Sequence, residues 1–273
     1  MRLSFSKMNG NGNDFIVINN MDRLIAIETL QDLARKLCQR RLSIGADGLI
    51  SIEPAQDAHF TMRLVNSDGS LAEMCGNGAR CAALYAFEKK IAPKNMTFAT
   101  PAGNIEAIVT PGGVSISMGN VSLKDVVQNE PLNINQEGIA YWHVTVGVPH
   151  TVIFLEPSDQ RSKEDLRSLS VAIQQDLVRF PNSTNVNYVK IMKDHLYTLT
   201  FERGVGDFTL SCGTGSIASA IAAWLKGKVK PPVKVQNPGG VNIVHFKETK
   251  DHLLNVSLEG PAAFSFEGVV TIN

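Results

Sequence analysis

The chain repeats itself at one fixed offset, and this repeat limits what it can fold into more than any other feature does. The motif Cys75-Gly76-Asn77-Gly78 recurs 137 positions later as Cys212-Gly213-Thr214-Gly215. The same offset keeps small and turn-forming residues in register on both sides of the motif, in the pairs Gly69/Gly206, Ala86/Ala223, Pro101/Pro238 and Gly103/Gly240. A repeat of this kind indicates a duplicated structural unit. We therefore predict two related α/β halves.

The two halves also share a hydrophobic pattern. Short apolar runs of strand length occur at 15–18 and 152–155. An amphipathic helix is expected after each run, because Thr29/Asp32 and Ser162/Asp165 have the spacing of a capping box. The apolar faces of these helices are expected to contain Leu30, Leu33, Ala34, Leu37 and Cys38 in the first half and Leu166, Leu169, Ile173 and Leu177 in the second.

A second helix is expected directly after each Cys-Gly-X-Gly turn, at about 79–90 and 216–226, with Gly227 as a C-cap. Strand-like segments at 60–65 and 197–202 precede the two turns. Because the segment 216–226 is apolar nearly all round, it predicts a buried central helix. Each half is therefore expected to form a sheet wrapped around a helix that begins at the Cys-Gly-X-Gly turn.

Charge and cysteine usage exclude several classes of partner. Lys+Arg and Asp+Glu each number 26, so no overall field would recruit nucleic acid or an anionic membrane. No apolar run approaches the length of a membrane span, and the N-terminal residues lack the apolar core of a secretory signal. The four cysteines form no CxxC pair, which argues against a zinc or thioredoxin-type site. We expect a cytoplasmic protein with free thiols.

The two turns predict a particular chemistry. A helix N-terminus offers unpaired N–H groups to a carboxylate, and a cysteine there is expected to have a lowered pKa. Cys75 and Cys212, one from each half, could then remove a proton from one face of a substrate α-carbon and return one to the other, without a cofactor or a metal. The alternative is that both are packing residues or partners in a disulfide. Cys38 and Cys81 are interpreted as structural.

Six segments in order along the chain resemble the diaminopimelate epimerase family: residues 8–15 (MNGNGNDF), 45–49 (GADGL), 66–81 (with NSDGS and MCGNGARC), 146–150 (VGVPH), 201–204 (FERG) and 211–215 (SCGTG). The resemblance implies an α/β fold of two pseudo-symmetric duplicated domains, each a curved, mainly antiparallel sheet around a central helix. The domains are expected at 1–120 and 121–261, with 262–273 packed back on the first. It also implies a homodimer without cofactor that converts L,L-diaminopimelate to the meso isomer for lysine and peptidoglycan synthesis.

The resemblance also assigns roles to individual residues. Cys75 and Cys212 would be the acid/base pair, with His150 and Glu202 beside them to ease proton transfer. The substrate-binding residues would be Asn13, Asn66, Gly76, Asn77, Asn185, Glu202, Arg203, Gly213 and Thr214. For the contact at Asn185, Asn182 and Asn187 are alternatives in the same polar run, and either Glu202 or Arg203 could face solvent because adjacent residues in a strand point apart.

Two departures and three rival functions stay open at this point. Some family members carry Gln at the position of Gly48 and Asn at that of Val148, so the grip on the substrate's far end is in doubt. The 137-residue offset pairs His150 with Asn13 and Arg203 with Asn66.

Three rival functions remain. They are a two-cysteine racemase of proline-like or histidine-like amino acids, a cysteine hydrolase that uses His150 with one thiol, and a non-catalytic binding protein.

Overall fold

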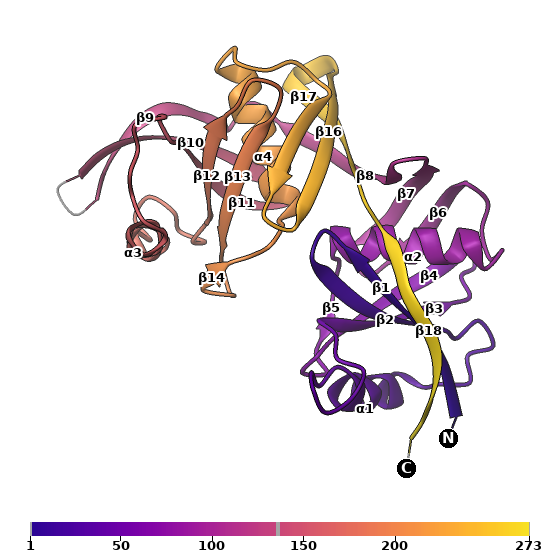
Figure 1. Cartoon of the computed structure of the whole chain (residues 1–273). Coiled ribbons are helices and arrows are strands. Elements are labelled where there is room, and N and C mark those ends of the chain that lie inside the picture. Colours follow the sequence, from indigo (N-terminus) through magenta and orange to yellow (C-terminus); the bar gives the residue numbers. More distant parts are fainter. Residues whose placement is uncertain (1, 135–136, 273) are drawn as a thin grey trace. The chain divides into compact units, whose positions relative to one another are not determined.

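The computed structural model describes residues 2–134 and 137–272, which divide into two compact units (Figure 1). The first unit comprises Met1–Ser117 and Glu259–Asn273, and the second comprises Met118–Leu258. Strands β8 (Gly113–Ser122) and β17 (Leu253–Gly260) carry the chain from one unit into the other. Both units combine β-sheet with two α-helices, so the predicted fold class of two duplicated α/β domains is confirmed.

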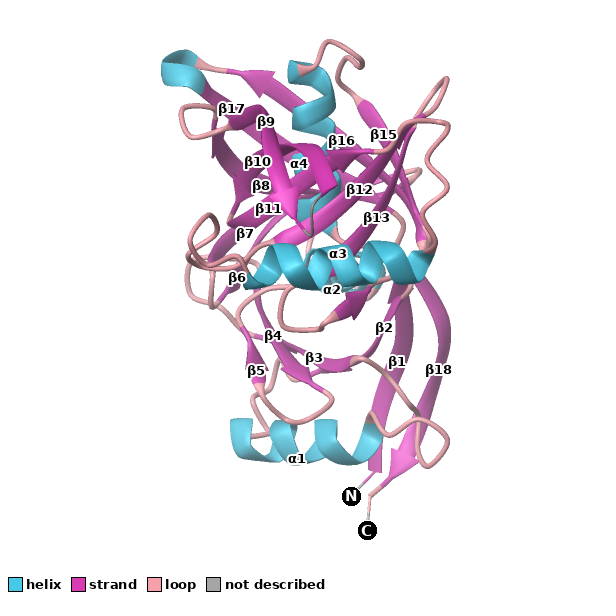
Figure 2. Ribbon diagram, turned by 90° about the vertical axis from the view of Figure 1, so that its left-hand side faces the viewer, coloured by secondary structure: helices cyan, strands magenta, loops and turns pink. Residues whose placement is uncertain are grey.

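The first unit is a sheet with one helix on each face. Its remaining elements are β1 (Arg2–Gly10), β2 (Asn13–Asn19), α1 (Ile27–Leu37), β3 (Gly48–Glu53), β4 (Phe60–Asn66), β5 (Leu71–Ala72), α2 (Gly76–Glu88), β6 (Asn95–Thr100), β7 (Gly103–Thr110) and β18 (Ala263–Thr271). Strand β18 pairs antiparallel with β1, which places the C-terminal segment beside the N-terminal strand (Figure 1). Helices α1 and α2 lie on opposite sides of this sheet (Figure 2).

Strand β2 has an uninterrupted apolar run because helices cover both of its faces. Ile16 and Ile18 pack in one cluster with Leu30 and Leu33 of α1. The alternate residue Phe15 lies under α2, where its ring is within 3.4 Å of the position a Cβ would take on Gly78. Because successive side chains of a strand point to opposite faces, a strand covered on both faces needs an uninterrupted apolar sequence.

The second unit repeats this arrangement. Its elements are β9 (Val127–Ile134), β10 (Glu137–Val146), β11 (Val148–Phe154), α3 (Lys163–Gln175), β12 (Asn185–Ile191), β13 (Leu196–Glu202), β14 (Asp207–Phe208), α4 (Gly213–Leu225), β15 (Val233–Asn237), β16 (Gly240–Glu248) and the 3₁₀ helix η1 (Lys250–His252). Helix α3 packs on Ile153 of β11 and Tyr188 of β12. Helix α4 is buried along almost its whole length, which confirms the predicted central helix.

The helix boundaries confirm some local predictions and correct others. The Ser162/Asp165 capping box is present at the start of α3, and Gly227 adopts a φ of +72° directly after the C-cap of α4. Helix α1 instead begins at Ile27 behind Ala26, with no side-chain cap, so the predicted Thr29/Asp32 box is wrong. Leu177 is exposed because α3 ends at Gln175, before the next turn of the predicted apolar face.

The strands show that the repeat does not keep one offset. Helix α4 starts 137 residues after α2, but β13 starts at Leu196, only 136 residues after Phe60 of β4. Strand β11 starts at Val148, 135 residues after Asn13 of β2, because the turn before it contains only Gly147 where the first unit has Asn11 and Gly12.

The strand pairings follow the same register, since Phe15 lies opposite Gly48 and His150 lies opposite Asn185. Asn13 therefore corresponds to Val148 and Asn66 to Glu202. The pairings of Asn13 with His150 and of Asn66 with Arg203 are wrong.

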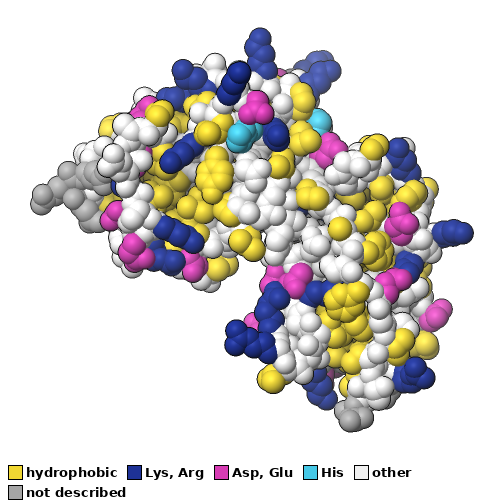
Figure 3. All heavy atoms as spheres, viewed as in Figure 1, with side chains coloured by type: hydrophobic (Ala, Val, Ile, Leu, Met, Phe, Trp, Pro, Cys, Tyr) yellow, Lys and Arg dark blue, Asp and Glu magenta, His cyan; other side chains and the backbone are white. Residues whose placement is uncertain are grey.

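Among the described residues, no helix is both long enough and apolar enough to cross a bilayer. Basic and acidic side chains are interspersed on the face shown in Figure 3, as expected from equal numbers of the two kinds.

Candidate active site

Cys75 occupies the N-cap of α2. Its backbone is extended (φ −140°, ψ 120°), and its carbonyl accepts the first helical hydrogen bond from Ala79 at 2.7 Å. The thiol is half-buried and makes no capping hydrogen bond with its own helix. The N–H groups of Gly76 and Asn77 are in the first turn, where a helix leaves its amides without intrahelical partners. This end of α2 can therefore bind a carboxylate next to a thiol.

Cys212 occupies the N-cap of α4 with nearly the same backbone conformation (φ −119°, ψ 116°). Its Sγ accepts the N–H of Gly215 at 3.3 Å and lies 3.5 Å from Oγ1 of Thr214. Gly215 has to be a glycine, because a Cβ there would lie 2.5 Å from Oδ1 of Asn187. The close approach of α4 to β12 therefore fixes the position of the thiol.

The electrostatic environment of Cys212 corrects one expectation from sequence. Burial raises the pKa of this thiol, and the neighbouring Glu202 carboxylate raises it further, whereas the hydrogen bonds from Thr214 and Gly215 lower it. The expectation of a lowered pKa at a helix N-terminus is therefore wrong for Cys212, because desolvation and a nearby negative charge outweigh the helix end. The surroundings of Cys212 therefore favour the protonated thiol over the thiolate.

Two of the predicted substrate-binding side chains, those of Asn13 and Asn77, meet at the first turn of α2. Asn77 donates from Nδ2 to Oδ1 of Asn13 at 2.6 Å, and Asn13 donates from Nδ2 to Oδ2 of Asp47 at 2.9 Å. Asn66 ends β4 and donates from Nδ2 to Oγ of Ser70 at 2.9 Å. Asn13 and Asn77 are thus directly linked, whereas Asn66 is held by its own turn.

His150 and Asn187 form a buried neutral pair below α4. Nδ2 of Asn187 lies 3.1 Å from Nδ1 of His150, and its Oδ1 accepts from Oγ1 of Thr200 at 2.9 Å. Because Asn187 presents its amide donor, Nδ1 of His150 is the acceptor and the ring proton is on Nε2. Burial lowers the pKa of His150 to about 3, with His143 and Arg203 acting in the same direction. His150 is therefore neutral at physiological pH.

Asn185, Glu202 and Arg203 meet where β12 begins and β13 ends. Oδ1 of Asn185 accepts the backbone N–H of Arg203 at 2.7 Å, and Oε1 of Glu202 accepts Oγ1–H of Thr209 at 2.9 Å. The Arg203 guanidinium donates to the carbonyl of Asn182. Arg203 is exposed and Glu202 is half-buried, so the two adjacent side chains differ in exposure as extended backbone predicts.

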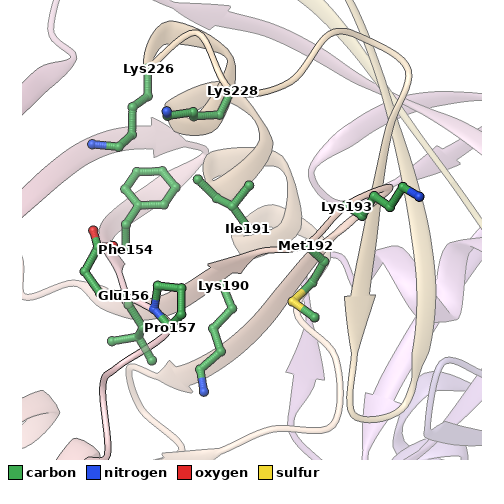
Figure 4. A pocket seen from close by; sticks show the side chains of 10 residues that line it. Phe154, Glu156, Pro157, Lys190, Ile191, Met192, Lys193, Lys226 and Lys228 are labelled. Atoms are coloured by element: carbon green, nitrogen blue, oxygen red, sulfur yellow. The ribbon is translucent and has the colours of Figure 1, made fainter.

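A groove in the second unit lies away from these residues. It has a volume of about 720 Å³ and is lined by five apolar residues of β11, β12 and the segments that follow them, by Glu156 and by four lysines. The lysines do not converge: in Figure 4 the chains of Lys190 and Lys193 point away from Lys226 and from each other. None of the predicted site residues lines this groove. Among residues 2–134 and 137–272, no cluster of three or more acidic, histidine or cysteine side chains is arranged to hold a metal ion.

Sequence reasoning missed two polar residues of these half-sites. Asn187 was considered only as a substitute for Asn185, although both belong to the site region and Asn187 is the one that contacts His150. Arg80 was not considered, although it is fully buried and donates from Nη2 to Oδ1 of Asn77 at 2.5 Å. A charged residue inside an otherwise apolar helix was the signal that could have identified it.

Comparison with known proteins agrees with the motifs. The sequence model of the diaminopimelate epimerase family matches residues 5–124 and 142–264. The diaminopimelate epimerase of Hydrogenobaculum sp. (strain Y04AAS1) is 38% identical over 291 aligned residues, which cover 97% of this chain and 98% of the relative. That of Caldanaerobacter subterraneus is 38% identical over 287 residues, covering 99% and 100%.

Solved structures share the fold at low identity. A PhzF-family phenazine biosynthesis protein from Bacillus anthracis has a TM-score of 0.74 at 14% identity and covers 100% of both chains. A probable proline racemase from Agrobacterium radiobacter has a TM-score of 0.69 at 17% identity, covering 99% of this chain and 93% of that one. The family model matches two segments that together span most of the chain, and the relatives align with it over nearly their full length. The chain therefore belongs to the diaminopimelate epimerase family.

Proposed function

We propose that the protein interconverts L,L-diaminopimelate and meso-diaminopimelate by proton transfer between the substrate α-carbon and two cysteine side chains. One observation carries the proposal: each unit places a cysteine at the N-cap of its buried helix, followed by Gly-X-Gly. Duplicated structure with a duplicated thiol suits a reaction that needs one group on each face of one carbon. A hydrolase with a single nucleophile would leave the second cysteine without a role.

In this proposal Cys75 and Cys212 act as the base and the acid, and exchange these roles when the reaction runs in reverse. One sulfur takes the α-proton as a thiolate and becomes a thiol. The other thiol gives its proton to the opposite face of the planar carbanion and becomes a thiolate. One proton leaves the substrate and one enters it, so the reaction needs no oxidant and no second substrate.

The carbanion requires charge stabilisation at the carboxylate attached to the reacting carbon. We assign this role to the helix N-termini, through the N–H groups of Gly76 and Asn77 in one unit and of Gly213 and Thr214 in the other. Fixed amide donors that face developing negative charge contribute about 3–4 kcal/mol per donor in other enzymes. Glu202 would accept or return the proton of a thiol, whereas the neutral His150, whose Nδ1 already accepts from Asn187, would act beside the thiols as an Nε2–H donor.

The remaining polar residues would hold the substrate's distal amino-acid group. Asn13, Asn66 and Asn185 offer neutral amide donors and acceptors, and Arg203 and Glu202 offer charges for a carboxylate and an ammonium group. On the strength of the family relationship we further propose a cytoplasmic homodimer that serves lysine and peptidoglycan precursor synthesis. The domains would be 1–120 with 262–273, and 121–261.

A substrate panel tests the proposal. The reduced protein is incubated with L,L-diaminopimelate, proline or histidine, and the stereoisomers of each are resolved by chiral chromatography. Formation of the meso isomer from L,L-diaminopimelate alone is the expected result. Turnover of proline or histidine, with diaminopimelate untouched, would overturn the substrate assignment while leaving the two-thiol chemistry standing.

A further inference from the structure

Arg80 is a cation buried within the helix that carries Cys75. It lies in the second turn of α2 and is the largest fully buried side chain among the described residues, with 0% of its surface exposed. Burying a guanidinium is costly unless its charge and its N–H groups are used. A function that needs the charge at this position would explain its presence.

The hydrogen bonds of Arg80 are few and specific. Nη2 donates to Oδ1 of Asn77 at 2.5 Å, and Nε donates to the carbonyl of Pro261 at 3.4 Å. Nη1 is buried and has no hydrogen-bond partner among the described residues. Among the residues that the structure describes, no carboxylate contacts the Arg80 guanidinium. Arg40 and Arg63, in contrast, are both paired with acidic side chains. The positive charge is therefore not neutralised by an acidic neighbour.

The groups that act electrostatically on Arg80 are the two cysteines of the same helix. Burial lowers the pKa of Arg80, and negative charge on Cys81 or Cys75 opposes that effect. Cys81 is not a candidate for the thiolate, because burial raises its pKa to about 12 even with Arg80 nearby. Cys75 is half-buried and is thus the more accessible of the two thiols.

Arg80 also determines which way two side-chain amides point. Its N–H occupies Oδ1 of Asn77, so the Asn77 amide must present Nδ2 to Asn13. Asn13 then accepts with Oδ1 and donates with Nδ2 to Asp47, whose other oxygen accepts from Arg40 at 2.9 Å. The chain of bonds runs from a buried cation to a carboxylate, and reversing either amide would bring donor against donor.

The second unit has no counterpart of this cation. Helices α2 and α4 align residue for residue at an offset of 137, and Ile217, which is fully buried, stands where α2 has Arg80. The residue beside the thiol of the second unit is the Glu202 carboxylate, which acts against a thiolate. A cation therefore acts on the thiol of the first half-site and a carboxylate on the thiol of the second.

We propose that Arg80 is a positioning residue of the Cys75 half-site, which fixes the Asn77 and Asn13 amides and supplies the positive charge that favours the Cys75 thiolate. The inference rests on the proposed function for its catalytic meaning. It makes Cys75 the resting base and Cys212 the resting acid.

The test is the rate of thiol alkylation by iodoacetamide, followed for each cysteine by peptide mass spectrometry in the folded protein. Arg80→Met is expected to slow alkylation of Cys75 at pH 7 about tenfold. A nearby positive charge favours the thiolate, which is the form that reacts, and the variant removes that charge. Arg80→Lys keeps the charge and is expected to stay within about threefold of the parent protein. Alkylation of Cys212 should not change in either variant.

Two controls separate this role from a loss of structure. Arg63→Met removes a guanidinium from the same unit, where it pairs with Glu53, and is expected to leave Cys75 alkylation unchanged. Thermal unfolding shows whether each variant is folded. If Arg80→Met does not fold, Arg80→Gln removes the charge while keeping a polar side chain, and it is judged by the same rates.

The outcomes are distinct for the two proposals. Slower alkylation of Cys75 alone, rescued by lysine, supports the role of Arg80. Equal rates in the parent and in a folded Arg80→Met or Arg80→Gln variant would overturn it. Alkylation does not depend on turnover, so a protein that shows the shift but does not epimerise diaminopimelate would retain this inference and lose the proposed function.

Discussion

The N-termini of α2 and α4 have the same backbone and opposite surroundings. Both helices span thirteen residues and begin behind a cysteine in extended conformation. The helix behind Cys75 contains the buried Arg80, and its Asn77 is linked through Asn13 to Asp47, which pairs with Arg40. Around Cys212 lie Glu202 and the neutral pair of His150 and Asn187. Duplication has preserved the geometry that positions a thiol, while the residues that set its charge have diverged.

The difference has a chemical use. An enzyme with two identical thiols would have no preference for which one holds the proton before substrate binds. Under the proposed mechanism, opposite electrostatics would give the pair one base and one acid, with a single proton held on one of the two thiols. The four predictions below follow from this contrast.

The largest effect is expected from removing either thiol. Cys75→Ser and Cys212→Ser should each lower kcat for epimerisation by about 10²–10⁴-fold, the usual contribution of a positioned acid or base. Cys38→Ser is the matched control, because burial raises the pKa of Cys38 to about 11 and this thiol lies in the core beneath α1. Near-normal epimerisation by either of the first two variants would contradict the contrast altogether.

Acid is expected to remove part of the stability of the first unit through Asp14. Burial raises the pKa of Asp14, but hydrogen bonds from Arg40 and Lys7 outweigh it and leave the pKa below the ordinary value of 3.8. A carboxyl with a lowered folded-state pKa stabilises the fold above its unfolded value, and this stability is lost as the pH falls through the folded value.

Asp14→Asn should therefore lower the free energy of unfolding of the first unit by about 2 kcal/mol at pH 7, and by progressively less as the pH falls below 3.8. Hydrogen exchange of peptides from β1 and β2 measures this. Asp207→Asn, which removes an exposed ion pair with Arg167 in the second unit, should leave those peptides unaffected. A pH-independent difference would show that the charge of Asp14 has no part in the stability.

Removing the carboxylate near Cys212 should make this thiol more reactive and so reduce the difference between the two cysteines. Glu202→Gln is expected to speed alkylation of Cys212 about three- to tenfold at pH 8, because the Glu202 charge raises the pKa of that thiol. Glu248→Gln, at the exposed end of β16, is the control. Slower or unchanged alkylation in Glu202→Gln would mean that burial alone determines the state of Cys212.

The smallest effect is expected at Val148, because the second unit has this apolar residue where the first unit has the side-chain amide of Asn13. Val148 corresponds to Asn13 by strand register. Val148→Asn should lower the KM for L,L-diaminopimelate about two- to tenfold, as one added hydrogen bond does, and Val148→Ala should not. Gly48→Gln is expected to destabilise the protein instead, because a Cβ there would lie 2.8 Å from the carbonyl oxygen of Val65. An unchanged KM in Val148→Asn would place this residue outside substrate contact.

Patterns set by local sequence were predictable. The central helix α4 follows from its all-round apolar character, and the positions of Cys75 and Cys212 at helix starts follow from the Cys-Gly-X-Gly repeat. The Ser162/Asp165 box is formed, whereas the same spacing at Thr29/Asp32 is not, because the α1 backbone is already helical from Ile27. The spacing alone does not say which of two nearby residues begins a helix.

Features that depend on register or on distant contacts were not predictable. One residue fewer in the turn at Gly147 shifts β11 relative to the repeat and exchanges His150 for Val148 as the counterpart of Asn13. The raised pKa of Cys212 depends on burial and on Glu202, which is brought close by the pairing of β13 with β14. Neither effect is visible in the motif that identifies the thiol.

The measurement that tests the central claim most directly is deuterium incorporation during early turnover of L,L-diaminopimelate in D2O. With one thiol on each face, the proton removed stays on one sulfur while the other delivers deuterium. Each meso molecule should then carry one α-deuterium, and the recovered L,L isomer should carry almost none. Equal labelling of recovered substrate and product would show that a single group serves both faces, and would contradict the account.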